Sequence, residues 1–318
     1  MTSLSSSTVA RFAGVVPPVA TPLLADGGID HVSLARLVDY LVDSGVHGLF
    51  ALGSTGETAY FTDDQRIEIV RTIVDTAAGR VPIIAGAIEL TSVRILETAR
   101  RIVATGVDAI VTTAPLYTLN SPAEVDAHFR AIGAGLDVPL WAYDVPVRVH
   151  SKLSLELLMG LAADGVIAGV KDSSGDDVGF RRLVSANAAA GRPLQLLTGH
   201  EVVVDAMLLA GADGVVPGLA NVEATGYVDL WDAATRGDWD AARAEQERLN
   251  RVFEIVFQPK GLSGDATGVG AFKAAMKARG IIDHATMAFP TQPLDGDAVE
   301  RIEGVLAGLD LLAERVAR

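Results

Sequence analysis

The chain has 318 residues, 49% of them hydrophobic, no cysteine, and a formal net charge of −14 at pH 7. This length allows one large domain or two ordinary ones with a substantial core. No apolar stretch reaches the ~18 residues that cross a bilayer. The negative charge repels nucleic acid and anionic membranes. The lack of cysteine excludes disulfides, thiolate nucleophiles and Cys-bound zinc.

Residues 1–12 begin with a polar, serine-rich segment. This segment lacks the basic start and apolar centre of a signal peptide. We therefore expect a disordered lead-in at 1–12 to a cytoplasmic protein that binds neither nucleic acid nor membranes.

Eight short apolar or β-branched segments follow, separated by stretches of helical length. Near-continuous apolarity is typical of parallel strands that are buried on both faces. The predicted strands are 15–20, 48–52, 83–87, 109–113, 140–143, 167–171, 195–198 and 214–217.

Helix-start signals support this repeat. Thr62 with Gln65 and Ser121 with Glu124 have the spacing of capping boxes after the second and fourth strands. The repeated unit predicts an α/β fold, a (βα)8 TIM barrel over 13–225, with its active site at the C-terminal ends of the strands. A doubly wound open sheet is the alternative, but it requires a glycine-rich phosphate loop after the first strand, where the chain has Thr-Pro-Leu at 21–23.

Beyond the eighth strand the pattern becomes purely helical. Helices are predicted at 222–235, 239–257, 270–279 and 297–317, and the glycine-rich stretch 261–270 is predicted to be a mobile loop. We expect a C-terminal helical extension over 226–318, packed on the barrel.

Lys171 closes the sixth predicted strand, in a chain that has five lysines against 21 arginines. Because side chains alternate along a strand, Gly169 faces the same way and leaves space beneath the lysine. Burial disfavours the charged ammonium, and a neutral amine can form a Schiff base. An ion pair of Lys171 with Asp172, or with a bound anion, is the alternative.

Other strand ends supply complementary groups. After the second strand, Ser54 and Thr55 stand between glycines, where hydroxyls and backbone N–H groups can bind a carboxylate. Tyr143 ends the fifth strand with a phenol that can relay protons. The residues collected at these strand ends are Gly53, Ser54, Thr55, Gly56, Tyr117, Tyr143 and Arg148.

A desolvated amine, a phenol, paired hydroxyls and a fixed cation together predict imine chemistry on a 2-oxo acid. This chemistry requires no metal, and the six histidines show neither HxH nor HExxH spacing. His200, after the seventh strand, is a candidate hydroxyl-binding residue or an ordinary loop histidine.

At these places the sequence resembles the dihydrodipicolinate synthase / N-acetylneuraminate lyase family of class I pyruvate-dependent lyases. The motifs that carry the resemblance are 53–57, Tyr117, 143–146 and 169–172. The resemblance implies the same barrel and no cofactor other than a covalent imine. It implies that Lys171 is the Schiff-base lysine and Tyr143 the proton donor and acceptor.

The same resemblance assigns the remaining roles. Ser54 and Tyr117 would complete a hydroxyl relay, Thr55 would bind the pyruvyl carboxylate, and the Val216 carbonyl would line the pocket. The residue at Tyr117 reaches into a neighbouring subunit's site in the family, which implies a homo-oligomer, a dimer or a tetramer.

The chain also departs from the family pattern. Arg148 matches the arginine that synthases use for the second substrate's carboxylate, but Val149 and His150 replace the usual Thr-Gly, Leu116 replaces a tyrosine and Asp144 a frequent Asn. Residues for feedback binding of lysine are not evident around Thr58, Asp63, Arg66 and Ile88.

We therefore expect a Schiff-base lyase of aldolase or dehydratase type that acts on pyruvate or a 2-oxo substrate resembling a 3-deoxy sugar acid. One alternative is a 4-hydroxy-tetrahydrodipicolinate synthase that condenses pyruvate with aspartate semialdehyde. A protein that binds a 2-oxo acid without catalysis is an alternative of another class.

Overall fold

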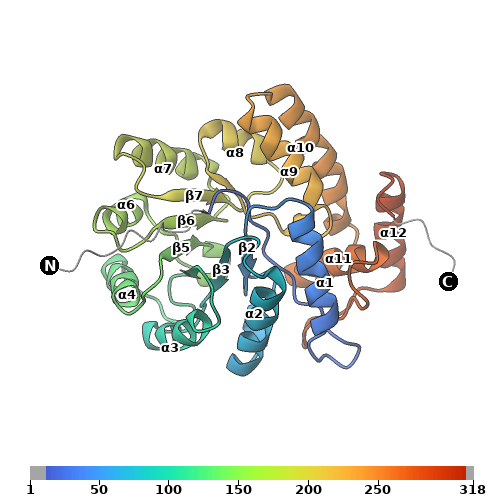
Figure 1. Cartoon of the computed structure of the whole chain (residues 1–318), viewed down its shortest axis with the longest axis horizontal. Helices are drawn as coiled ribbons and strands as arrows, with labels where there is room; N and C mark the ends of the chain where they lie inside the picture. Colours follow the sequence, from blue (N-terminus) through green and yellow to red (C-terminus); the bar gives the residue numbers. More distant parts are fainter. Residues whose placement is uncertain (1–11, 313–318) are drawn as a thin grey trace.

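The computed structural model of the protein describes residues 12–312, and its centre is a ring of parallel strands (Figure 1). Within these residues the sheet has eight strands in the order β1-β8-β7-β6-β5-β4-β3-β2. They are β1 Gly14–Val15, β2 Leu49–Ala51, β3 Ile83–Gly86, β4 Ala109–Thr112, β5 Leu140–Asp144, β6 Gly169–Asp172, β7 Gln195–Thr198 and β8 Gly214–Val215. All eight predicted strand positions are confirmed, although β1 and β8 are shorter than predicted.

Hydrogen bonds between the segments of β1 and β2 close the sheet into a barrel. The Val19 N–H donates to Phe50 O and the Phe50 N–H to Pro17 O, both at 2.9 Å. Pro18 and Phe50 form a parallel bridge at the same seam. The (βα)8 TIM barrel is therefore confirmed, and the doubly wound sheet is not the architecture.

A layer of helices surrounds the strands (Figure 1). The helices of this layer are α1 His31–Asp43, α2 Asp63–Ala77, α3 Ser92–Val103, α4 Pro122–Ala134, α6 Leu155–Ala163, α7 Asp177–Ala189, α8 Val204–Ala210 and α9 Ala224–Thr235. Shorter helices in the loops are η1 Thr58–Tyr60, α5 Pro146–Val149 and η2 Gly218–Asn221. Both predicted capping boxes are present, at Thr62 and at Ser121. None of the helices within residues 12–312 has the length and apolarity needed to span a membrane.

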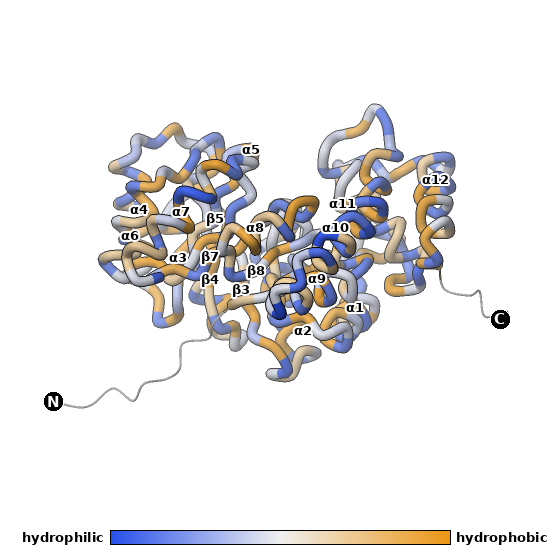
Figure 2. The backbone as a smooth tube through the Cα atoms, turned by 90° about the horizontal axis from the view of Figure 1, so that it is seen from above, coloured by the Kyte–Doolittle hydropathy of each residue, from blue (hydrophilic) through white to orange (hydrophobic). Residues whose placement is uncertain are grey.

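The C-terminal helices lie at one side of the barrel, with α12 beyond α11 (Figures 1 and 2). They are α10 Trp239–Phe253, η3 Glu254–Phe257, α11 Gly264–Ala278 and α12 Gly296–Ala307. The mobile loop predicted at 261–270 is wrong from Gly264 onward, because α11 starts there. Ser263 caps this helix by accepting the Ala266 N–H at 3.2 Å, and Asp265 lies in its first turn, where the helix dipole favours an acidic side chain.

Two boundaries in the structure differ from the predicted ones. The division between 225 and 226 falls inside α9, which follows β8 and completes the ring. The helix predicted to 317 ends at Ala307. The lead-in predicted at 1–12 lies outside the described residues except for Phe12, which is fully buried and packs edge-on against Trp141 at 5.7 Å between ring centroids.

Trp141 fills the space that Gly169 leaves beneath Lys171. A Cβ atom on Gly169 would lie 2.6 Å from the indole ring, so only glycine fits opposite this side chain in the β5–β6 register. The predicted space under the lysine is therefore present, but it serves core packing.

Backbone atoms of β1 leave no space for a side chain on β8 at Gly214. A Cβ atom on Gly214 would lie 2.2 Å from Gly14 O. We expect Gly214→Ala to lower the free energy of unfolding by roughly 2–3 kcal/mol, because backbone atoms cannot yield as a side chain can. Gly304→Ala, in exposed α12 with no atom near the new methyl, should instead raise it by about 0.5–1 kcal/mol. Chemical denaturation measures both, and equal effects would contradict the prediction.

Candidate active site

Lys171 and Tyr143 lie side by side at the C-terminal end of the barrel. They are direct partners in the β5–β6 register. The Lys171 Nζ lies 4.2 Å from the Tyr143 ring centroid and 4.7 Å from that of Phe50. Lys171 is 6% exposed and Tyr143 3%, so the amine is enclosed by aromatic rings.

The environment of Tyr143 makes its phenol more acidic than usual. Burial alone raises the pKa of a phenol, but the positive charge of Lys171 and polar contacts with Ser173, Ser54 and Lys171 outweigh burial and lower the pKa of Tyr143. The predicted lysine, tyrosine and Ser54 are therefore brought together in one buried cluster.

The residues that follow this pair along each strand point away from it. Asp144 accepts hydrogen bonds from Lys152 and from the Leu153 N–H, the latter at 3.1 Å. Asp172 accepts the Ser174 N–H at 2.8 Å. Among residues 12–312 no carboxylate forms an ion pair with Lys171, so the alternative of a Lys171–Asp172 pair is wrong.

The segment after β2 forms a tight loop with strained backbone. Leu52 adopts a left-handed φ of 55°, a conformation that is costly for a bulky residue and frequent at functional sites. The N–H groups of Gly56 and Glu57 donate back within the loop, to Gly53 O and Ser54 O, so those two are not free as predicted. The Ser54 and Thr55 N–H groups donate to no described residue.

Glu57 anchors this loop to the C-terminal helices. Its carboxylate pairs with Lys273 of α11 and accepts the Ala288 N–H at 2.9 Å. The Lys273 side chain is fully buried and also donates to Thr286 O at 2.8 Å. Burial lowers the pKa of Lys273, and the Glu57 carboxylate opposes that effect.

Two cavities open beside the cluster. The first, of about 460 Å³, is lined by Ser54 and Tyr143 and extends to Arg66, Glu89 and Arg148. The second, of about 400 Å³, adjoins it and is lined by residues of the β2 loop, η3 and α11. The residues that line the second cavity are Ser54, Thr55, Arg148, Glu201, Phe253, Val256, Phe257, Gly264, Asp265, Thr267, Gly268, Val269 and Phe272.

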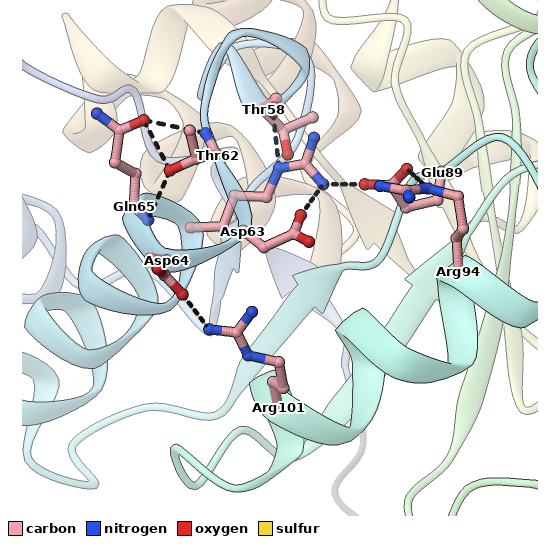
Figure 3. A network of polar contacts seen from close by, with 9 residues as sticks. Thr58, Thr62, Asp63, Asp64, Gln65, Glu89, Arg94 and Arg101 are labelled. Atoms are coloured by element: carbon pink, nitrogen blue, oxygen red, sulfur yellow. Dashed lines mark hydrogen bonds and ion pairs between the residues drawn. The ribbon is translucent and has the colours of Figure 1, made fainter.

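The far wall of the first cavity is an ion-pair network (Figure 3). Glu89 lies between Arg66 and Arg94, and its distance to Arg94 Nε is 3.1 Å. Burial raises the pKa of Glu89, but the two guanidinium groups outweigh burial and hold its pKa below the usual value. Arg66 also donates from its Nε to Thr58 O at 3.0 Å.

Arg148 is also engaged. Its Nη1 donates to Asp265 Oδ2 at 2.9 Å and its Nη2 to Asp265 Oδ1, which makes a bidentate ion pair between α5 and α11. This pair raises the pKa of Arg148. The predicted cation is thus at the cavity mouth, but it already holds a carboxylate.

The structure leaves three predicted residues outside this cluster. Tyr117 is 85% exposed on the loop after β4. Val216 is buried directly after β8 and lines neither cavity. His200 contacts Asp177 at 2.8 Å rather than a cavity, which favours an ordinary loop histidine.

Two further polar residues were missed at the sequence level. Ser173 contacts Tyr143, and the serine pair after Lys171 was the available signal. Glu201 lines the second cavity and accepts the Leu219 N–H at 2.7 Å. Burial raises the pKa of Glu201 from 4.5 to about 7, against the opposing effects of that N–H and of Lys171.

These features define a (βα)8-barrel enzyme with its site at the C-terminal ends of the strands. A model of the Dihydrodipicolinate synthetase family matches residues 11–308. An uncharacterized DapA-like lyase of Halobacterium salinarum is 34% identical over 300 residues, 94% of each chain. A 4-hydroxy-tetrahydrodipicolinate synthase of Phenylobacterium zucineum is 33% identical over 248 residues, 77% of this chain and 82% of that protein.

Solved structures agree. YagE of E. coli K12, a prophage protein of the dihydrodipicolinic acid synthase family in complex with pyruvate, has a TM-score of 0.89 at 28% identity, over 95% of this chain and 100% of that chain. CdNal from Clostridium difficile in complex with mannosamine shares the fold, with a TM-score of 0.86 at 18% identity over 94% of this chain and 100% of that chain. The chain belongs to the dihydrodipicolinate synthetase family, whose members are lyases and synthases, and the predicted family is confirmed.

Glu201 should leave a signature in the pH dependence of stability. A carboxyl group whose pKa is higher in the folded than in the unfolded state favours folding while it is protonated. Its contribution to the free energy of unfolding is fully present below pH 4.5 and is lost as the pH rises to about 7. Glu201→Gln retains an acceptor for the Leu219 N–H without this titration, so its melting temperature relative to wild type should rise between those pH values. Thermal melts check this, with exposed Glu300→Gln as control, and a pH-independent difference would contradict it.

Proposed function

We propose that the protein is a Schiff-base-forming lyase of aldolase or dehydratase type, acting on pyruvate or a 2-oxo substrate similar to a 3-deoxy sugar acid. The observation that carries the proposal is the buried Lys171–Tyr143 pair. Tyr143 lines the first cavity together with Ser54, so a substrate in this cavity would lie beside the pair. An amine enclosed by aromatic rings and beside an acidified phenol suits imine formation.

In the proposed reaction the neutral Lys171 amine attacks the ketone carbon of the 2-oxo acid. A new C–N bond forms, the former carbonyl oxygen leaves as water after taking one proton from the nitrogen and one from Tyr143, and an iminium results. Loss of a C3 proton, or cleavage of the C3–C4 bond, then yields an enamine. Tyr143 is placed to carry protons in these steps, because its ring centroid lies 4.2 Å from the Lys171 Nζ and it lines the first cavity together with Ser54.

The carboxylate of the 2-oxo acid has a matching site in the β2 loop. The unpaired N–H groups of Ser54 and Thr55, with their half-buried hydroxyls, form a set of donors near the tyrosine. Gly53 and Gly56 permit this loop, because a Cβ atom on either would lie 2.9 Å from a neighbouring group, the Phe50 ring or Val19 O. Cytoplasmic location and independence of metals and cofactors stay predictions.

A second candidate is 4-hydroxy-tetrahydrodipicolinate synthase. This candidate is favoured by the Phenylobacterium zucineum relative, which is a 4-hydroxy-tetrahydrodipicolinate synthase. Turnover of pyruvate with aspartate semialdehyde would identify it. A protein that binds 2-oxo acids without catalysis would instead be stabilised by pyruvate and form no imine.

The imine is the decisive test. We expect borohydride with pyruvate to add a reduced three-carbon adduct to Lys171, located by peptide mass spectrometry, and Lys171→Met to abolish it. Tyr143→Phe should slow exchange of the pyruvate C3 protons in D2O by about 10²–10⁴-fold. An unmodified Lys171 in the wild-type protein would overturn the proposal.

We further propose that a second copy of the chain covers Tyr117. Large apolar side chains are exposed on the adjoining loops after β3 and β4, among them Leu90 at 45%, Tyr117 at 85% and Leu119 at 93%. Exposed apolar groups on neighbouring loops mark an association surface. In such a homo-oligomer Tyr117 would complete the partner's hydroxyl relay.

Mixing of two inactive variants tests the shared tyrosine. We expect Lys171→Met and Tyr117→Phe proteins each to lose proton exchange. After equal amounts are mixed and subunits redistribute, about half of the dimers contain one copy of each variant, and one of the two sites in such a dimer is complete. The mixture should therefore recover about a quarter of the wild-type rate of proton exchange. Full exchange by Tyr117→Phe alone, or no recovery in a mixture shown to contain mixed dimers, would contradict this arrangement.

A further inference from the structure

The Arg148 guanidinium stands at the junction of the two cavities. Arg148 and Asp265 both line both cavities, together with Ser54 of the proposed carboxylate loop. The Arg148 side chain is 45% exposed and that of Asp265 22%. A substrate that extends from the buried cluster toward solvent therefore passes this ion pair.

Asp265 uses the same donors that a substrate carboxylate would use. The fork of an arginine binds one carboxylate in bidentate fashion, and here both Nη atoms already contact the two Asp265 oxygens. Asp265 is held in place in the first turn of α11, capped by Ser263. An internal carboxylate fixed next to its cation competes at a high effective concentration with any free one.

The second positively charged side chain of the cavity walls, Arg66, also forms an ion pair. Among the described residues that line the two cavities, the positively charged side chains are Arg66 and Arg148. Arg66 is paired with buried Glu89. Glu201, the remaining acidic group of the second cavity, adds no attraction for an anion. The cavities thus offer no unpaired positive charge for a second carboxylate.

The second cavity has an apolar wall instead. Phe253 packs edge-on against Phe257 and Phe272, with ring centroids 5.9 and 6.5 Å apart, and Val256 and Val269 extend the same surface. Phe257 remains 55% exposed. An uncharged substituent can bury surface here, whereas a carboxylate would lose hydration without a partner.

We propose that Asp265 is a specificity-determining residue, which occupies Arg148 and thereby excludes 2-oxo acids that carry a second carboxylate. The substrate class is a 2-oxo acid whose chain beyond C3 is uncharged. This inference rests on the proposed imine at Lys171. It disfavours acceptors such as aspartate semialdehyde, which carry their own carboxylate.

Imine trapping with matched acids tests the proposal without requiring turnover. The probes are 2-oxoglutarate against 2-oxopentanoate and 2-oxoadipate against 2-oxohexanoate, which differ in one terminal carboxylate. Half-saturating concentrations for borohydride trapping are measured by mass spectrometry. We expect wild type to have a higher half-saturating concentration for each dicarboxylic acid than for its monocarboxylic partner. Asp265→Asn should reduce the ratio of these two concentrations about tenfold within each pair, because the Arg148 guanidinium becomes available to the second carboxylate.

Two further variants separate selectivity from stability. The double variant Arg148→Met, Asp265→Asn should not show the improved trapping of dicarboxylic acids, because it has no guanidinium at position 148 to bind the second carboxylate. Asp283→Asn is the matched control, since Asp283 forms a bidentate surface pair with Arg36 at 2.9 and 3.1 Å, and it should retain the wild-type ratio. Melting temperatures of all variants show whether the Asp265 pair also fastens α11.

The outcomes are distinguishable. Absence of any adduct with pyruvate in wild type would overturn the proposed function and this inference with it. Trapping with pyruvate but an unchanged ratio in Asp265→Asn, or trapping of pyruvate alone by wild type and variant, would overturn the role of Asp265 only. Equal trapping of both acids of a pair by wild type would do the same.

Discussion

The register between β5 and β6 is the constraint on which the site depends. It pairs Tyr143 with Lys171 and, one layer below, Trp141 with Gly169. A shift of β6 by one residue would turn Lys171 to the opposite side of the sheet, because neighbouring residues of a strand face opposite sides. The Trp141 indole occupies the space over Gly169, so core packing and the lysine–tyrosine pair specify the same register.

The C-terminal helices take part in the site as well as covering the barrel. From α11, Lys273 reaches Glu57 in the loop after β2, and Asp265 reaches Arg148 in the loop after β5. The first pair is fully buried, and a buried pair is destabilised strongly when one partner is lost. The second pair is partly exposed and therefore far more easily exchanged. One helix thus holds the loop after β2 rigidly and the loop after β5 loosely.

Short-range patterns in the sequence predicted the barrel and the central residues of the site. Capping boxes, strand-ending lysine and tyrosine, and glycine-bounded hydroxyls act over a few residues and could be seen locally. Contacts between distant segments could not: Asp265 lies 117 residues from Arg148, and its place in a glycine-rich stretch suggested a loop. Glu201 was missed for the same reason, because an acidic residue in a loop becomes distinctive only when the fold places it in the wall of a cavity.

Lys171 influences two acids whose surroundings differ. Burial raises the pKa of both Tyr143 and Glu201, and the positive charge of Lys171 lowers both. Lys171 and two serines favour the ionised phenol, so the pKa of Tyr143 falls, whereas Lys171 affects Glu201 through charge alone and the pKa of Glu201 rises to about 7. The proton affinities of the two groups are therefore drawn together from the wide separation of an ordinary phenol and carboxyl. A smaller difference in proton affinity lowers the free-energy cost of moving a proton from one group to another through a bound substrate, which would favour the general acid–base steps of the proposed reaction.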